Sequence, residues 1–198
     1  LALGYGGGKN ALNRMGALDM GLTEDELPSL VEQWRAANPK IVEFWKRCDK
    51  AAIYAIKNRA STTVENIRFW CPENVLYIDL PSGRSLAYRS PEIKKDENGY
   101  DKIVYRGGKD KKLQEISTYG AKLVENIVQG ISRDILAFAL GNLTDYRVVA
   151  HVHDEVIVEV PMDTQIQTIC NIMEQTPSWI TELPLKAEGY ECPYYQKQ

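Results

Sequence analysis

The chain has 198 residues, a formal net charge of −3, and hydrophobic and charged shares of 44% and 26%. This composition is typical of a soluble globular protein with one substantial core or two lobes. No apolar run of about 18 residues occurs, so we expect no membrane span. The mild negative charge argues against a general polyanion binder, although a nucleic-acid enzyme needs only a local positive face.

The cysteines and the first residue bear on cellular context. Cys48, Cys71, Cys170 and Cys192 lie far apart and form no CxxC pair. This spacing favours buried free thiols over disulfides or zinc ligands, so we expect a reduced, cytoplasmic protein. The sequence opens on Leu1, inside an apolar and glycine-rich phrase, and we expect no signal peptide. We therefore expect a piece of a longer protein.

The amino-terminal third has helix signals. Residues 1–8 read LALGYGGG, an apolar run broken by four glycines, which predicts the last turn of a helix followed by a loop. Residues 23–26 read TEDE, a capping box that predicts a helix ending at Asn38. Pro39 suits the first position of a second helix. We expect residues 1–60 to be mainly helical.

Strand signals begin near residues 61–63. Residues 75–80 and 85–90 flank a turn sequence and predict a hairpin. Residues 94–112 carry seven bases and four acids around a predicted strand at 103–105. A solvated β-ribbon is the simplest interpretation of that charged segment.

Apolar residues at helical spacing predict a long helix over residues 113–140. Polar residues on another face recur at steps of four, three and four, and form a basic and amide-bearing stripe: Lys122, Asn126, Gln129 and Arg133. A polar face without a ligand remains an alternative for this stripe. Farther on, the sequence predicts a helix over 163–174 and a strand over 185–195.

Residues 148–160 read VVAHVHDEVIVEV and predict a hairpin with polar groups at its tip. The flanks are rich in Val and Ile, which is typical of largely buried strands. His and Asp are among the few non-glycine residues that tolerate the positive φ of a tight turn. We expect the turn to present His153, Asp154 and Glu155.

The tip favours a hard cation over zinc. The chain has only two histidines, His151 and His153, and its cysteines lack ligand-like spacing, so a zinc site would lack further ligands. Magnesium instead prefers one or two carboxylates together with phosphate oxygens and waters. Asp154 suits that role. A polar turn with no ligand function remains the alternative for an isolated HDE motif.

Three phrases in this order resemble the family A DNA polymerases, above all their phage and prophage versions, and are similar to bacterial DNA polymerase I. They are LGYGGG at 3–8, YGAKLVENIVQGISRDIL at 119–136 and HVHDEVIVEV at 151–160. The resemblance implies an α+β fold from the carboxyl-terminal part of the polymerase domain. Residues 1–60 would be part of the helical fingers. Residues 61–198 would be the palm, an antiparallel sheet with packed helices and a β-hairpin insertion around 72–112.

The resemblance also implies roles at the active site. Tyr5 and Gly6 would close the fingers helix, with Tyr5 near the templating base and the incoming nucleotide. Asp154 would be one of two metal-binding aspartates, His153 would touch the primer terminus, and Glu155 would assist. Such enzymes join nucleotides with two Mg²⁺ ions.

For the long helix, the resemblance implies DNA minor-groove contacts. Purine N3 and pyrimidine O2 are acceptors on every base pair, so amide and guanidinium donors can check geometry without reading sequence. Gln129 matches the family glutamine best. The asparagine of bacterial polymerase I aligns at Glu125, so Asn126 substitutes only if the contact has shifted by one residue. Lys122 and Arg133 would add basic contacts.

The implied partners are primer-template DNA, deoxynucleoside triphosphates and the remainder of the polymerase chain. The family's other catalytic aspartate and its nucleotide-binding arginine and lysine would precede Leu1. We therefore expect this chain alone to be inactive. The alternative is a non-catalytic DNA-binding remnant or accessory module of a decayed prophage polymerase, which the upstream coding sequence would distinguish.

Overall fold

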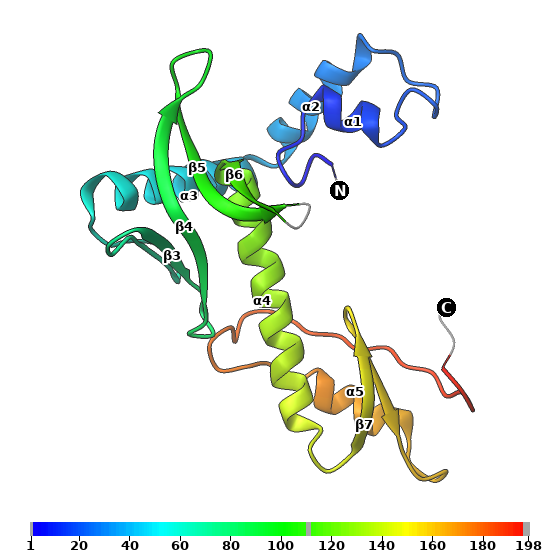
Figure 1. Ribbon diagram of the computed structural model, residues 1–198. Helices are drawn as coiled ribbons and strands as arrows, with labels where there is room; N and C mark the ends of the chain where they lie inside the picture. The colour runs from blue at the N-terminus through cyan, green and yellow to red at the C-terminus, as the bar shows by residue number, and fades with distance from the viewer. Residues whose placement is uncertain (1, 110–111, 196–198) are drawn as a thin grey trace. The chain divides into compact units, whose positions relative to one another are not determined.

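The computed structural model describes residues 2–109 and 112–195. They combine α-helices with antiparallel strands (Figure 1), in agreement with the expected mixture of the two. Backbone contacts divide the chain into two compact units, Leu1–Val128 and Gln129–Gln198. Each unit is described separately below.

Three helices precede the first strand: α1 (Lys9–Arg14), α2 (Glu26–Ala37) and α3 (Pro39–Asn58). Half of the predicted capping box precedes α2: the Thr23 N–H and hydroxyl both donate to the Glu26 carboxylate at 2.8 Å, whereas the Glu26 N–H donates to the Thr23 carbonyl instead of its side chain. These bonds lower the pKa of Glu26. Pro39 occupies the first turn of α3, as predicted, where its missing N–H costs no hydrogen bond.

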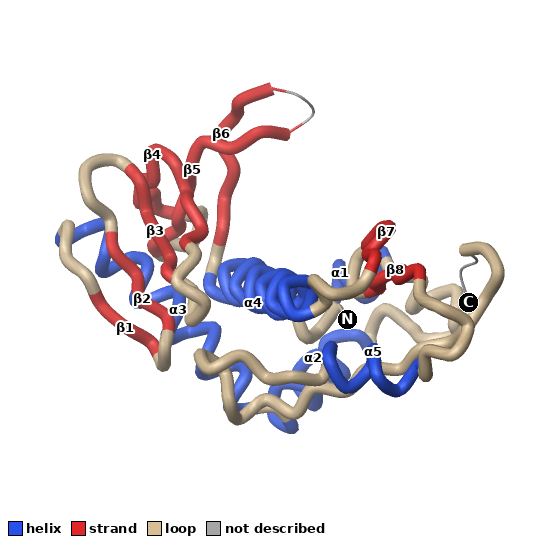
Figure 2. The backbone as a smooth tube through the Cα atoms, turned by 90° about the horizontal axis from the view of Figure 1, so that it is seen from below, coloured by secondary structure: helices blue, strands red, loops and turns tan. Residues whose placement is uncertain are grey.

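The rest of the first unit is dominated by a six-stranded antiparallel sheet in which consecutive strands are neighbours. Figure 2 shows these strands in red. The expected hairpin at 75–90 is confirmed, and its second strand continues farther than predicted. The strands are β1 (Thr62–Val64), β2 (Ile67–Trp70), β3 (Val75–Asp79), β4 (Ser85–Lys95), β5 (Asp101–Lys109) and β6 (Lys112–Thr118).

One face of this sheet supplies the core of the first unit. We call it the inner face, because α3 packs against it along strands β1–β4. Side chains on the inner face alternate with exposed ones along each strand, as the two-residue period of a strand requires. Its buried members include Ile67, Phe69, Leu76, Ile78, Tyr88 and Ile103.

The predicted helix over 113–140 is wrong at its start. Residues 112–118 form β6, which pairs with β5, and α4 (Gly120–Asn142) begins only after Tyr119. Ile116 and Tyr119 fit a helical spacing, but Ile116 and Thr118 also fit the two-residue period of a strand. Pairing with β5 decides in favour of the strand. Leu113 consequently lies exposed on the sheet edge.

The expected fingers and palm boundary near residue 60 falls between α3 and β1, which pack together within the first unit. The compact units divide instead at Val128, within α4. The assignment of subdomains stays a prediction.

The second unit contains the end of α4, the strands β7 (Arg147–Val152) and β8 (Glu155–Glu159), and α5 (Ile166–Met173). Both the predicted hairpin and the predicted helix near 163–174 are confirmed. The strand expected over 185–195 is wrong, because that segment pairs with no strand among the described residues. Its residues are mostly exposed.

The cysteine prediction is confirmed in part. Cys48, Cys71 and Cys170 are buried free thiols, whereas the free thiol of Cys192 is exposed. Burial raises the pKa of Cys48 to about 12, so this thiol stays protonated at neutral pH.

Candidate active site

The β7–β8 hairpin ends in a turn made by His153 and Asp154. Val152 pairs with Glu155, which leaves only these two residues between the strands. His153 has a φ of 54°, the left-handed conformation that the sequence predicted for this tip. Such a backbone costs an L-residue about 1–2 kcal/mol. Arg59, Glu65, Glu73 and Ser90 also have a positive φ, so this conformation does not by itself mark the tip as a functional site.

The residues of the tip differ in exposure. His153 and Asp154 are exposed, whereas Glu155 is half-buried. The Tyr195 hydroxyl donates to Glu155 Oε2 at 3.1 Å, and this bond to the carboxylate raises the pKa of Tyr195. The tip therefore presents one carboxylate to solvent and holds the next one by a hydrogen bond.

The strands behind the tip are less buried than predicted. Every residue of β7 and β8 is half-buried or exposed, although most carry apolar side chains. A β-bulge separates the Val148–Val158 pair from the Ala150–Ile157 pair. At the open end of the hairpin, Arg147 forms an exposed ion pair with Glu159 at 3.0 Å.

The donor set at the tip fits magnesium better than zinc. Within the described ranges, no three His, Cys, Asp or Glu side chains lie close enough together to hold a metal ion. A zinc site needs three or four protein ligands, whereas magnesium is held by one or two carboxylates that share the ion with phosphates and waters. Asp154 is an exposed carboxylate that could hold such an ion.

The glycine-rich segment at the start of the chain has the backbone hydrogen bonds that are typical of a helix C-terminus. The Gly7 N–H donates to the Ala2 carbonyl and the Gly6 N–H donates to the Leu3 carbonyl, each at 3.0 Å. With Gly6 at a φ of +76°, these bonds have the pattern of a Schellman motif, as the predicted helix end requires, although residues 2–6 form a turn and no helix precedes them among the described residues. Tyr5, just before Gly6, is exposed.

Gly6 lies directly beside the start of α4. A Cβ at this position would collide with the Ala121 side chain. Gly120 is equally close to α3, because a Cβ there would collide with the Trp45 carbonyl oxygen. Asp49 accepts the Gly120 N–H, while burial is the larger influence and raises the pKa of Asp49. The Tyr5 segment and the start of α4 thus form one tightly packed region.

The predicted polar stripe begins in the first unit. Lys122 pairs with Glu125 at 2.7 Å, and the Glu125 carboxylate is mostly covered. The Asn126 amide donates to the Tyr88 hydroxyl of β4 at 2.8 Å. Burial raises the pKa of Tyr88. Asn126 therefore joins α4 to the sheet through its donor group.

The remaining two stripe residues, Gln129 and Arg133, are exposed and belong to the second unit. They continue along the same helix, so α4 carries polar side chains in both units. The structure therefore places Tyr5 and Gly6 with Lys122 in the first unit, and the HDE turn with Gln129 and Arg133 in the second.

Two contacts were missed from the sequence. Tyr195 lies 40 residues from Glu155, and Tyr88 lies 38 residues from Asn126. Neither tyrosine stands in a motif, so only the fold brings each pair together.

The chain is similar along its whole length to part of a phage protein. A protein of Bacillus phage SP02 named DNA polymerase is 46% identical over 203 aligned residues, which cover 100% of this chain and 31% of the phage protein. The chain thus spans less than a third of that relative's length. No family model and no solved structure matches the chain.

The helices were also compared with the length and apolarity that a bilayer requires. Among the described residues, none is both long enough and apolar enough to cross a membrane.

Proposed function

We propose that this chain is the carboxyl-terminal part of the polymerase domain of a phage-type family A DNA polymerase. The complete enzyme would extend a DNA primer on a template with deoxynucleoside triphosphates. The observation that carries the proposal is the 46% identity to a phage protein named DNA polymerase, covering this chain from end to end. The proposal rests on that similarity together with the chemistry of the hairpin tip.

In this proposal the β7–β8 hairpin belongs to the palm. Asp154 is exposed at the turn and would hold Mg²⁺, while His153, in its strained backbone, would contact the primer terminus. Glu155 would assist from its position beside Asp154, oriented by the Tyr195 hydroxyl. Two magnesium ions in such a site activate the 3′-hydroxyl and neutralise the leaving pyrophosphate.

The tip alone lacks part of this machinery. A two-ion site needs a second carboxylate, and the described residues bring no further acidic cluster to Asp154. We propose that another part of the polymerase polypeptide supplies that aspartate and the arginine and lysine that bind the triphosphate. The 198-residue chain alone would then not extend a primer.

The polar side chains of α4 would contact primer-template DNA. Gln129 and Arg133 are exposed and suit donors in the minor groove or at phosphates. Lys122 and Glu125 form an ion pair, and Asn126 is bonded to Tyr88, so their part would be to position the helix. Tyr5 would lie near the templating base, held by the Schellman motif at Gly6.

Primer extension tests the proposal directly. We expect no extension by the purified chain, and Mg²⁺-dependent extension by the protein encoded together with the upstream sequence. In that longer protein, Asp154→Ala should reduce the rate at least about 100-fold, since metal ions supply several kcal/mol of charge stabilisation.

Asp163→Ala is the matched control, because Asp163 is also an exposed acid in the second unit but lies outside the hairpin. Its rate should stay near wild type. Extension by the isolated chain would contradict the proposed division of the site, and full activity of Asp154→Ala would contradict the role of the turn. An inactive longer protein that still binds DNA would favour the non-catalytic remnant.

A further inference from the structure

The solvent-facing side of the six-stranded sheet, which we call the outer face, is distinct from the residues of the proposed active site. Strand pairing places its members opposite one another: Trp70 faces Tyr77, Tyr77 faces Ala87, and Arg89 faces Arg106. All five are half-buried or exposed, whereas Phe69 and Leu76 beside them in sequence are buried on the inner face.

An aromatic pair stands on this outer face. The rings of Trp70 and Tyr77 stack with centroids 5.0 Å apart and planes inclined by 27°. The Arg68 guanidinium lies 5.1 Å from the centre of the Trp70 ring. The Trp70 indole N–H donates to Asp79 Oδ1 at 3.0 Å, which fixes the orientation of the ring. The pair is therefore a rigid aromatic platform that solvent reaches.

Two guanidinium groups continue the row from this platform. Arg89 and Arg106 are directly opposite each other in β4 and β5, and both are exposed. Like charges in this arrangement are unfavourable. Neither forms an ion pair with any described residue: the neighbouring Glu115 is bonded to Lys94 at 2.6 Å. The Glu115 carboxylate follows Arg106 in the row, on β6, but it is already bonded to Lys94, so the row carries more cations than anions.

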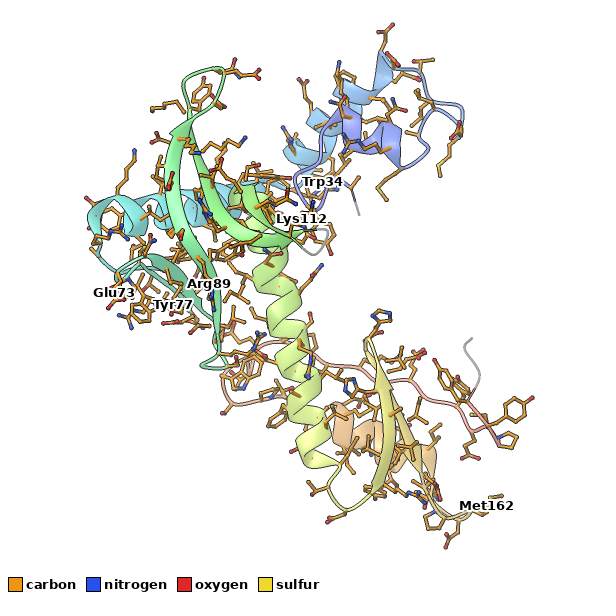
Figure 3. The ribbon with its side chains drawn as sticks, viewed as in Figure 1. Trp34, Glu73, Tyr77, Arg89, Lys112 and Met162 are labelled. Atoms are coloured by element: carbon orange, nitrogen blue, oxygen red, sulfur yellow. The ribbon has the colours of Figure 1, made fainter. Side chains whose placement is uncertain are left out.

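The spacing places cations beside the aromatic rings. Tyr77 pairs with Ala87, and Arg89 lies two residues farther along the same strand. Arg89 is therefore a diagonal neighbour of Tyr77 on the same face, with their Cα atoms about 7–8 Å apart. Figure 3 labels Tyr77 and Arg89 in this β3–β4 part of the sheet. Arg106 follows on the next strand, about 5 Å farther along the row.

Stacked aromatic rings beside two neighbouring arginines match one class of partner. A base has a π-face that stacks on an aromatic ring, and the phosphates that follow it are anions. We propose that the outer face of β2–β5 binds single-stranded DNA, with a base on the Trp70–Tyr77 platform and phosphates at Arg89 and Arg106. In a duplex the bases are already stacked within the helix, so the platform selects unpaired strands. This binding needs neither metal nor nucleotide and does not rest on the proposed polymerase activity.

Fluorescence anisotropy of the 198-residue chain with a fluorescein-labelled 12-nucleotide oligothymidine tests this surface. A labelled 12-base-pair duplex is the comparison, both without metal. We expect tighter binding of the single strand. Tyr77→Ala should weaken it about 5- to 150-fold, the usual range for loss of one stacked base. Ala87→Glu adds a carboxylate at an exposed position facing Tyr77, should weaken binding as well, and removes no packing.

The salt dependence of DNA binding tests the two arginines separately from the aromatic pair. Replacing Arg89 and Arg106 together by Gln should flatten the dependence of log affinity on log salt by about 1.4, because each phosphate contact contributes about 0.7 for a single strand. The matched control replaces Arg47 and Lys95 by Gln. It removes two positive charges from the same unit, but from residues that already pair with Glu65 and Asp101. Its slope should equal that of wild type.

Equal or tighter binding of the duplex by the wild-type chain would overturn the proposal, as would no binding of either DNA. Equal changes of the salt slope in the two double variants would overturn it too. Failure of primer extension by the longer protein, with these binding results intact, would count only against the polymerase assignment.

Discussion

The six-stranded sheet and the β7–β8 hairpin are built from similar residues but are covered very differently. In the sheet, Phe69, Leu76 and Ile78 are fully excluded from solvent. In the hairpin, Val156 and Ile157 remain half-buried. The difference comes from α3, which packs along the inner face of the sheet. β-branched and aromatic residues therefore indicate a strand, whereas burial depends on a second element that covers it.

The largest effect should come from opening the core of the covered sheet. Phe69→Ala should lower the free energy of unfolding of the first unit by about 3–5 kcal/mol, because it leaves a cavity at a side chain with no exposed surface. Ile157→Ala in the hairpin should cost about 1 kcal/mol in the second unit, since a half-buried side chain loses less contact with apolar neighbours.

Hydrogen exchange measured by mass spectrometry resolves the peptides of each unit and so reports the two losses separately. Equal losses of unfolding free energy for the two variants would contradict the difference between the regions, because the hairpin would then be as well covered as the sheet.

A smaller effect is expected from the two ends of α4. Gly120→Ala should destabilise the first unit by about 1–3 kcal/mol, since its Cβ has to displace the α3 backbone at Trp45. Gly141→Ala, at the other end of the same helix, meets no atom within 4 Å and should stabilise by about 0.5 kcal/mol. Urea unfolding followed by circular dichroism measures both. A harmless alanine at residue 120 would show that the start of α4 is loosely packed.

The smallest effect concerns Asp49, a half-buried acid of the first unit. Burial raises the pKa of Asp49, so the folded chain binds this proton more tightly than the unfolded chain does. The resulting stability is present at low pH and is lost as pH rises from the usual value of about 3.9 through the raised pKa.

Asp49→Asn stays neutral and still has an oxygen that can accept the Gly120 N–H. Its melting temperature relative to wild type should therefore rise between pH 4 and 7 as the wild-type acid ionises, an interval set by the usual aspartate value. A difference that stays constant across this range would show that Asp49 is well solvated.

Local signals were sufficient for much of the fold. The capping box at Thr23, Pro39 at the start of α3 and the glycines after Tyr5 each act through the backbone of a few adjacent residues. Pro39 is confirmed in full, and the other two are confirmed in part, by the bonds to Glu26 and by the tight turn at Gly6. The positive φ of His153 belongs with them, because His tolerates this conformation. The two-residue length of the turn was not predicted, and it leaves Glu155 at the start of β8 instead of in the turn.

Long-range pairing decided what the sequence could not. Residues 113–118 fit both a helix and a strand, and β5 selects the strand. The segment at 185–195 has no partner strand among the described residues, so it remains without regular structure. At the candidate site, the sequence indicated the carboxylates of the tip but not the Tyr195 hydroxyl that orients Glu155, which arrives from 40 residues away.

The bulge in β7 also bears on how the length of this region can vary. Val149 is an extra residue between the Val148–Val158 and Ala150–Ile157 pairs, with no counterpart on β8. A strand can absorb an added or deleted residue at such a point while the pairing beyond it is kept. Related chains can therefore differ in length between α4 and the turn while Val152 stays opposite Glu155. The carboxylates at the tip then keep their place although the segment leading to them changes.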